Sequence, residues 1–258
     1  MAGESDVRLR PGHGTAPPAP RSVFLTAEWR NLVLLNYQVE PALLAPLVPA
    51  GTELDPWDGA ALVSLVGFEF LRTRVLGVAL PGHGAFPEVN LRFYVRRRAP
   101  EGWRHGVVFI QELVARPAIC LAARLLYQEP YRTVPMWQRV ALDRQDGVGC
   151  LAYGWTWRGA AFRISATVSG SPRSVARPSE TAFVTERYWG YTRLRHGRSR
   201  EYRVDHPPWQ VWPACEARYQ VERAPGFGGP LGVVLAGEPG SVCAVPGSAV
   251  TMYRGVAI

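Results

Sequence analysis

The stretch FPEVNLRFYVR, residues 86–96, decides how the fold of this chain is interpreted. Its apolar and polar side chains alternate strictly, which is typical of a β-strand, because successive side chains of a strand point to opposite faces. One face carries Val89, Leu91, Phe93 and Val95, and the other carries Glu88, Asn90, Arg92 and Tyr94. The apolar face predicts contact with a core. The polar face is open to two interpretations, a solvated surface or the wall of a site, and its mixture of an amide and a phenol with charged groups favours the second.

The segments around this strand are also rich in Val, Phe, Tyr, Trp and Thr, and Gly and Pro separate them at short intervals. This pattern predicts a mostly β fold with a minor helical part. Strands are expected at Ala60–Val75, Val89–Arg97, Val107–Val114, Trp137–Leu142, Leu151–Trp157 and Phe162–Val168. The last three should form a meander, because residues 143–147 and 158–159 contain the Asp, Gln and Gly residues that hairpin turns use.

Two segments predict short helices, at Pro41–Val48 and at Pro117–Tyr127. Each begins with a proline, which suits the first turn of a helix, and Pro130 ends the second because a proline disfavours helical geometry in the residue before it. The second helix should be amphipathic. Its expected apolar face consists of Ala118, Leu121, Ala122, Leu125 and Leu126, with Arg124 on another face.

The chain has 258 residues, of which 47% are apolar, enough to bury a full core. Residues 1–21 contain four prolines and three glycines without apolar periodicity, so we expect a flexible arm followed by one domain at 22–258. No segment has the apolar run of a secretory signal or of a membrane span. These features predict a soluble, cytoplasmic protein that makes no contact with a membrane.

A net charge of +8 and the arginine clusters at 96–98 and 193–203 raise the question of nucleic-acid binding. The basic side chains comprise 29 arginines and no lysine, and the other arginines are scattered among apolar segments. This distribution indicates a compositional bias rather than selection for phosphate contacts, and nucleic acid is not the expected partner. The four cysteines show no ligand spacing and are expected to be reduced core thiols, so no metal or other cofactor is predicted.

Several segments together resemble a known family. They are TAEWRNLVLLNYQVEP at 26–41, PEVNLRFYV at 87–95, AARLLYQEPYR at 122–132 and TERYWGYT at 185–192. On these residues the chain resembles the YqjF-like family of uncharacterised bacterial proteins, which is placed near acetoacetate decarboxylase. That resemblance implies a closed antiparallel β-barrel with an internal cavity and a few short helices.

The decarboxylase pattern A-G-R-E-x-x-G-x-P-K-K aligns without gaps on residues 122–132, with its arginine on Arg124 and its proline on Pro130. Its two lysines, which supply the Schiff-base nucleophile and the neighbour that lowers its pKa, fall on Tyr131 and Arg132. A guanidinium cannot form an imine with a ketone, and no lysine elsewhere can replace the lost amine. The sequence therefore excludes decarboxylation through a lysine imine. By the same resemblance, Glu88 takes the place of the cavity carboxylate.

The candidate site follows from the polar strand face and from this alignment. Its expected catalytic residues are Glu88, Tyr131 and Arg132, and its expected substrate-binding residues are Asn90, Arg92, Tyr94, Arg124, Tyr188, Trp189 and His206. Arginines bind a carboxylate through paired hydrogen bonds, while Glu88 suits a general base if burial raises its pKa. Tyr188, Trp189 and His206 belong to an aromatic segment that is either a core layer or a wall for the ligand.

Two function classes remain open. The first is an acid–base enzyme of the dehydratase, cyclase or lyase type that acts on a small organic acid or carbonyl compound without a lysine. The second is a non-catalytic binding or sensing protein on the same fold, with Glu88 paired structurally to Arg92 or Arg124. The sequence leaves open whether the protein forms a homo-oligomer.

Overall fold

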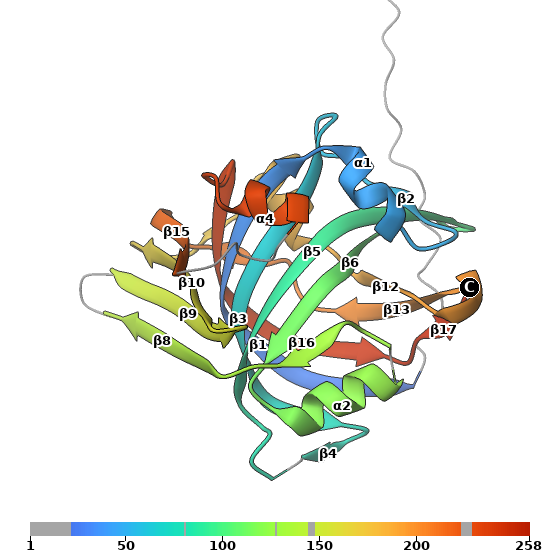
Figure 1. The fold of residues 1–258 in the computed structure, drawn as a ribbon, viewed down its shortest axis with the longest axis horizontal. Helices are drawn as coiled ribbons and strands as arrows, with labels where there is room; N and C mark the ends of the chain where they lie inside the picture. The colour runs from blue at the N-terminus through green and yellow to red at the C-terminus, as the bar shows by residue number, and fades with distance from the viewer. Residues whose placement is uncertain (1–21, 80, 127, 144–147, 223–228) are drawn as a thin grey trace, which may run out of the picture.

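The computed structural model describes residues 22–79, 81–126, 128–143, 148–222 and 229–258 (Figure 1). The expected flexible arm at 1–21 lies outside these residues. Most of the described chain is strand, so the prediction of a mostly β fold is confirmed. None of the described helices is long and apolar enough to cross a membrane.

The strands of the large sheet are β1 (Val23–Val39), β2 (Glu53–Leu54), β3 (Ala61–Val75), β4 (Val78–Ala79), β5 (Phe86–Ala99), β6 (Gly102–Val114), β7 (Tyr131–Thr133), β12 (Trp189–Arg193), β13 (Ser199–Asp205), β16 (Ser241–Tyr253) and β17 (Val256–Ala257). A second sheet contains β8 (Met136–Leu142), β9 (Gly149–Trp157), β10 (Ala160–Val168) and β15 (Ala214–Glu222), and a third contains β11 (Arg173–Ser174) and β14 (Gln210–Val211). The α-helices are α1 (Pro41–Leu44), α2 (Pro117–Leu126), α3 (Glu180–Thr185) and α4 (Gly229–Leu235), with 3-10 turns at Ala45–Leu47 and Arg195–Gly197.

The main path of the large sheet runs in the order β2-β5-β3-β1-β16-β13-β12-β6-β7. Strand β5 also pairs with β6, from Glu88 opposite Val114 to Ala99 opposite Gly102, so the order of pairing returns to β5. Most of these pairings are antiparallel, whereas β6 pairs in parallel with β7 and β12. The long strands bend strongly in Figure 1, and a bulge between Leu91 and Arg92 interrupts the register with β6.

Both faces of β5 are buried from Glu88 to Val95. Its apolar side chains belong to a core shared with the second sheet, where Leu91 and Phe93 join Tyr153 and Ile164. The opposite face points to the inner side of the large sheet, where Tyr94 joins a second apolar cluster. The polar face of the strand is therefore not solvated, which leaves the wall of a site as its interpretation.

Strands β8, β9 and β10 form the expected meander, with antiparallel pairing throughout. The β9–β10 connection is the two-residue turn Arg158-Gly159, in which both residues have positive φ, 52° and 78°. Such a turn matches the twist of a hairpin and favours glycine at its second position. The other expected turn, at 143–147, falls mostly outside the described residues.

Helix α2 lies across one end of the large sheet (Figure 1). Its bounds match the sequence prediction closely. Of the expected apolar face, Ala122 does point inward, but Leu121 and Leu125 were predicted wrongly, because they are 60% and 71% exposed. The inward side carries the smaller residues Ala122 and Ala123 together with Ile119. The expectation of four core cysteines is also partly wrong, since Cys215 is exposed, although all four are free thiols.

Candidate active site

A cavity of about 110 Å³ lies within the large sheet and beneath α2. Strands β1, β3, β5, β6, β12, β13 and β16 all contribute lining residues, and α2 closes one side with Ile119, Ala122 and Ala123. An apolar cavity of about 150 Å³ is large enough to bind benzene. This cavity therefore suits a small organic molecule of a few heavy atoms.

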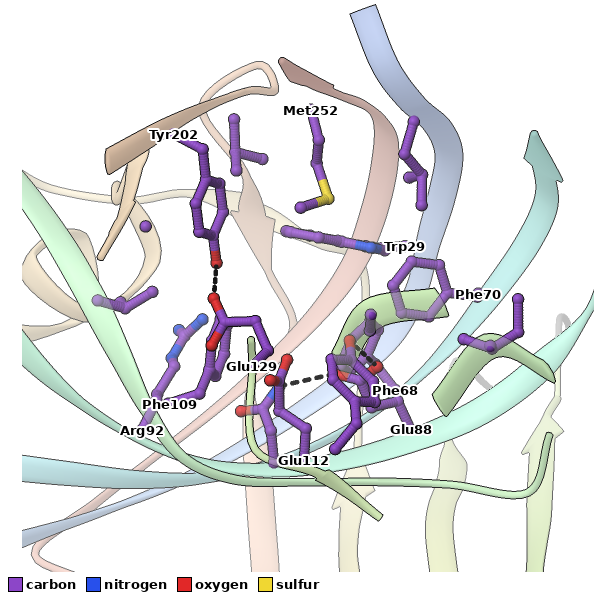
Figure 2. A pocket seen from close by; sticks show the side chains of 18 of the residues that line it. Trp29, Phe68, Phe70, Glu88, Arg92, Phe109, Glu112, Glu129, Tyr202 and Met252 are labelled. Atoms are coloured by element: carbon purple, nitrogen blue, oxygen red, sulfur yellow. Dashed lines mark hydrogen bonds between the residues drawn. The ribbon is translucent and has the colours of Figure 1, made fainter. Parts of the chain in front are cut away.

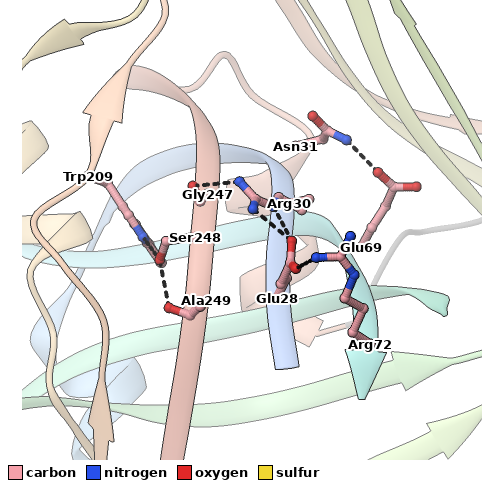
Figure 3. Close-up of polar contacts among 9 residues, drawn as sticks. All are labelled: Glu28, Arg30, Asn31, Glu69, Arg72, Trp209, Gly247, Ser248 and Ala249. Carbon is pink, nitrogen blue, oxygen red and sulfur yellow. Dashed lines mark hydrogen bonds and ion pairs between the residues drawn. The ribbon is translucent and has the colours of Figure 1, made fainter. Parts of the chain in front are cut away.

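The cavity has an aromatic side and a polar side (Figure 2). Trp29 stands edge-on to Phe68 and Phe70, with ring centroids 5.6 and 6.0 Å away, and Met252 is drawn beside Trp29 in Figure 2. Such a wall holds the apolar part of a ligand by contact area rather than by hydrogen bonds.

The polar side brings together three carboxyl groups, those of Glu88, Glu112 and Glu129 (Figure 2). Glu88 and Glu112 come from the paired strands β5 and β6, and Glu129 lies between α2 and β7. They are 2%, 2% and 6% exposed. Within the described chain, none of the three forms an ion pair with an arginine or histidine, which is unusual because buried carboxylates are normally paired.

Burial raises the pKa of Glu88 to about 7. Two hydrogen bonds act in the opposite direction, one from Asn90 Nδ2 to Oε1 at 3.2 Å and one from the Tyr131 hydroxyl to Oε2 at 2.9 Å. Burial and the nearby carboxyl groups raise the pKa of Tyr131 well above its ordinary value. Tyr131 therefore remains a protonated phenol, able to donate a hydrogen bond but not to act as a base at neutral pH.

The other two carboxyl groups also hold their protons more tightly than usual. Burial raises the pKa of Glu129 to about 7, although Thr192 and Tyr202 both donate hydrogen bonds to its Oε1. Burial, together with the charges of Glu129 and Glu88, raises the pKa of Glu112 well above its ordinary value. At neutral pH the polar side of the cavity therefore contains both protonated and ionised carboxyl groups, as a site for proton transfer requires.

Tyr202 can reach Glu129 because Gly190, its partner on the neighbouring strand, has no side chain. A Cβ atom at position 190 would lie 2.1 Å from the Tyr202 ring. Gly190 thus makes room for the Tyr202 ring, and the Tyr202 hydroxyl group helps to position the carboxyl group of Glu129.

Arg92 is the buried cation that β5 contributes to the cavity wall. Its Nη2 donates to the carbonyl oxygen of Val184 at 2.9 Å, and its Nε has no hydrogen-bond partner in the described chain. Unpartnered atoms also occur on four further lining residues, at Trp29 Nε1, Thr73 Oγ1, Asn90 Oδ1 and Glu112 Oε2. Since buried polar atoms in native proteins are nearly always hydrogen-bonded, this concentration indicates a cavity built to hold a polar ligand or water.

Comparisons with known proteins identify the family. The model of the DUF2071 family, described as an uncharacterized conserved protein, matches residues 26–246. The chain belongs to the DUF2071 family. It is also 30% identical over 195 residues to the uncharacterized protein YqjF of Bacillus subtilis (strain 168), covering 75% of this chain and 76% of that protein.

Solved structures show which fold this DUF2071 protein shares. Acetoacetate decarboxylase from Legionella pneumophila is similar with a TM-score of 0.62 and 14% identity, covering 95% of this chain and 93% of the other. The enduracididine biosynthesis enzyme MppR complexed with pyruvate is similar with a TM-score of 0.63 and 14% identity, covering 99% and 98%. At such identities the likeness establishes the acetoacetate-decarboxylase-like fold alone.

Of the ten residues predicted from the sequence, five line the cavity of this DUF2071 protein. They are Glu88, Asn90, Arg92, Tyr131 and Trp189. Tyr131 and Arg132 are neighbours on β7, and adjacent side chains of a strand point in opposite directions. Tyr131 reaches the cavity, whereas Arg132 lies in an outer groove with Arg124, so the expectation that these arginines share the cavity is corrected.

Tyr94 does not line the cavity, although it shares a strand face with Arg92. Its hydroxyl group hydrogen-bonds to Ser64, and its ring packs against Phe183 of α3, with centroids 5.1 Å apart. Helix α3 therefore packs against this part of the β5 face.

Tyr188 and His206 lie in a separate surface groove on the other side of Trp189. The His206 ring stacks between Tyr188 and Trp209, with centroid distances of 4.8 and 4.2 Å. Burial lowers the pKa of His206, so its ring is neutral at physiological pH. The two residues anchor an aromatic stack and do not touch the carboxyl groups.

Glu112, Glu129 and Tyr202 also line the cavity, but they were not among the site residues predicted from the sequence. Glu112 could have been noticed as the one charged residue in the mostly apolar segment FIQELV, residues 109–114. Glu129 lies inside the segment aligned with the decarboxylase pattern, at a position where that pattern specifies no residue. Among the described residues, no group of three His, Cys, Asp or Glu side chains has the spacing of a metal site.

Proposed function

We propose that this protein binds a small carbonyl or hydroxy compound in the cavity and catalyses an acid–base reaction on it, of the lyase, dehydratase or cyclase type. One observation carries the proposal, the presence in a single cavity of three buried carboxyl groups that form no ion pair within the described part of the chain. Two of them have a pKa raised to about 7, where a group can serve equally well as acid and base. The likeness to MppR, solved with the keto acid pyruvate, supports the choice of ligand class.

Glu88 is the proposed general base. Its carboxylate takes a proton from the carbon next to a carbonyl group, and the electron pair of the C–H bond moves towards the carbonyl oxygen. Arg92 Nε and a protonated Glu112 are the donors on the cavity wall that can stabilise the developing negative charge. Return of the proton from Glu88, or departure of a β-hydroxyl group protonated by Glu129, completes the reaction.

The proposed chemistry needs no amine. The chain contains no lysine, so no lysine side chain of it can form an imine with the substrate. We therefore propose a reaction in which the substrate's own carbonyl oxygen, rather than an imine nitrogen, accepts the electron pair. We further propose that the pairing of β5 with β6 closes the large sheet into a barrel that excludes water from this step.

A second candidate is a protein that binds such a compound without converting it. The observation that favours it is the aromatic side of the cavity, which by itself provides affinity but no chemistry. This alternative predicts thermal stabilisation by a ligand that is never consumed.

The test is proton exchange at the carbon next to the carbonyl group, followed by NMR in D₂O for a panel of small ketones, keto acids and hydroxy acids. We expect at least one compound to exchange or to lose water in a protein-dependent way. The substitution Glu88→Gln should lower that rate by about 100-fold or more, because general bases typically contribute that much. Ligand affinity should stay within about tenfold, as expected for a group used mainly in the transition state.

The matched control is Glu40→Gln, which makes the same change at an exposed carboxyl group outside the cavity. It should leave the exchange rate unchanged. An equal rate in wild type and Glu88→Gln would refute the catalytic role of Glu88. Stabilisation by a panel compound without any exchange or consumption would establish the binding function instead.

A further inference from the structure

An outer groove of about 620 Å³ borders the cavity. It lies against α2 and β7, and its lining includes the arginines Arg124, Arg132 and Arg195. Glu129 and Tyr131 line both the groove and the cavity. These two side chains therefore stand at the boundary between the two spaces.

The three groove arginines are free to bind an anion. Within the described chain none of them forms an ion pair, and Arg132 donates only from Nε to Gln111 Oε1, at 3.1 Å. Its guanidinium carbon lies 5.7 Å from the Trp157 ring centroid, within reach of a cation–π contact. Planar guanidinium groups bind phosphate and carboxylate oxygens through paired hydrogen bonds.

Only one acidic residue, Glu129, lines the described part of the groove. Its Oε1 already accepts hydrogen bonds from Thr192 and Tyr202, and its pKa of about 7 leaves it partly neutral. The net charge that a ligand would meet in the groove is therefore positive.

The cavity offers the opposite environment. Three buried carboxyl groups face it, and Arg92 is the one cation among its described lining residues that is not paired with an acidic side chain. Placing a dianion there would add repulsion to the loss of hydration, because unpaired charges are expensive to bury. A substrate with a strongly anionic end therefore fits best when that end lies outside the cavity, in the groove.

We propose that the groove binds a phosphate or carboxylate group at the far end of the substrate, while the reactive carbonyl end passes Tyr131 and Glu129 into the cavity. The substrate class is thus a carbonyl or hydroxy compound with an anionic tail. The reactive end rests on the proposed function above, whereas anion binding in the groove does not.

The experiment titrates the full chain calorimetrically with inorganic pyrophosphate and, separately, with citrate, at a fixed ionic strength. We expect saturable binding of at least one anion with one site per chain. The double substitution Arg124→Ala/Arg132→Ala should weaken it at least tenfold. The matched control, Arg139→Ala/Arg173→Ala, removes two exposed arginines outside the groove and should change the affinity less than threefold.

Tighter binding of pyrophosphate assigns a phosphate tail, and tighter binding of citrate assigns a carboxylate tail. Absence of saturable binding by both anions, or equal weakening in the two double variants, would overturn the proposal. If the groove variant does not fold, as judged by circular dichroism, Arg195→Ala tested alone must still weaken binding at least threefold.

Glu88→Gln separates this proposal from the proposed function. It should bind the anion within threefold of wild type, because Glu88 does not line the groove. An unchanged proton-exchange rate in that variant, with anion binding intact, would refute the acid–base function alone. Loss of anion binding in Glu88→Gln would refute the groove as an independent site.

Discussion

Strand β13 and the cavity both bury carboxyl groups almost completely, but the buried carboxyl group on β13 is in ion pairs and those in the cavity form none among the residues that the structure describes. Glu201 on β13 is 1% exposed, and Arg104 Nη1 lies 2.5 Å from its Oε1 while Arg97 Nη1 lies 3.2 Å from its Oε2. The Tyr191 hydroxyl adds a hydrogen bond at 3.1 Å. Glu112 on β6 is 2% exposed, yet it forms no ion pair within the described chain and its Oε2 has no hydrogen-bond partner there.

Asp55 shows what pairing does to a buried carboxyl group. Burial alone would raise its pKa, but hydrogen bonds and charge from His105 and Arg187 hold that pKa below its ordinary value. At the three cavity carboxyl groups hydrogen bonds also act against burial, and at Glu129 the charge of Arg200 does so too, yet the pKa of each group remains raised. Burial alone therefore does not distinguish a reactive carboxyl group from a structural one in this fold. The lack of an ion pair among the described residues marks the reactive one, because without an ion pair burial keeps the pKa raised.

The largest expected effect comes from breaking the paired region. Arg104→Ala should lower the free energy of unfolding by about 3 kcal/mol, because removing one partner leaves a buried charge undercompensated. The side chain of Arg104 is 10% exposed, and Arg97 remains to limit the loss. Urea denaturation measures the effect.

The control for this substitution is Arg96→Ala, which removes the more exposed ion pair with Glu53 and should lower stability by less than about 1 kcal/mol. Adding Glu201→Gln to Arg104→Ala should restore part of the loss, since it removes the uncompensated charge. If Arg104→Ala lowered the free energy of unfolding by less than about 1 kcal/mol, the Arg104–Glu201 ion pair would not stabilise the fold, and the contrast with the cavity carboxyl groups would be refuted.

A smaller effect of opposite sign is expected in the cavity. Glu112 has a pKa of about 4.5 in the unfolded chain and a higher pKa in the folded protein. The folded protein therefore loses stability as the pH rises from about 4.5 to the folded pKa, because the unfolded chain gives up this proton more easily. Glu112→Gln should therefore leave stability unchanged at pH 4 and raise it at pH 8. Urea denaturation at the two pH values tests this expectation. Glu201→Gln, the same change in the paired region, should not stabilise at pH 8, and equal behaviour of the two variants would remove the distinction between the regions.

The sequence predicted the fold well where one local rule decides the outcome. Alternation in β5 separated the face with Leu91 from the face with Asn90, and the Arg158-Gly159 turn identified a hairpin. Periodicity failed for α2 because the helix has two apolar stripes, and the stripe of small alanines faces the cavity while Leu121 and Leu125 face outward. A hydrophobicity pattern ranks the larger residues as the buried ones and cannot recognise that a cavity wall favours small ones.

The candidate site was predictable only in the part that belongs to one strand. Glu88, Asn90 and Arg92 share the polar face of β5. The opposition of Asn90 and Glu112 depends on a register with a bulge one residue away, which no local pattern specifies. The hydrogen bond between Tyr202 and Glu129 joins residues 73 positions apart, so it exists only once the sheet has assembled. Arg132 was misplaced because a sequence alignment does not show which neighbour on β7 points inward.

The smallest expected effect concerns the hydrogen bonds that adjust the pKa of each cavity carboxyl group. The Tyr131 hydrogen bond lowers the pKa of Glu88, so Tyr131→Phe should raise that pKa from about 7 by roughly half a unit to one unit, an effect of about 1 kcal/mol. Carbon-13 NMR titration of the labelled glutamate carboxyl groups measures it, and the pH profile of proton exchange should shift upward by the same amount. Tyr202→Phe is the crossed control, because it removes a donor to Glu129 and should move the pKa of Glu129 while leaving that of Glu88 nearly unchanged. If both substitutions moved both carboxyl groups equally, the three groups would titrate as one coupled unit, and the separate role of Glu88 as the base would have no basis.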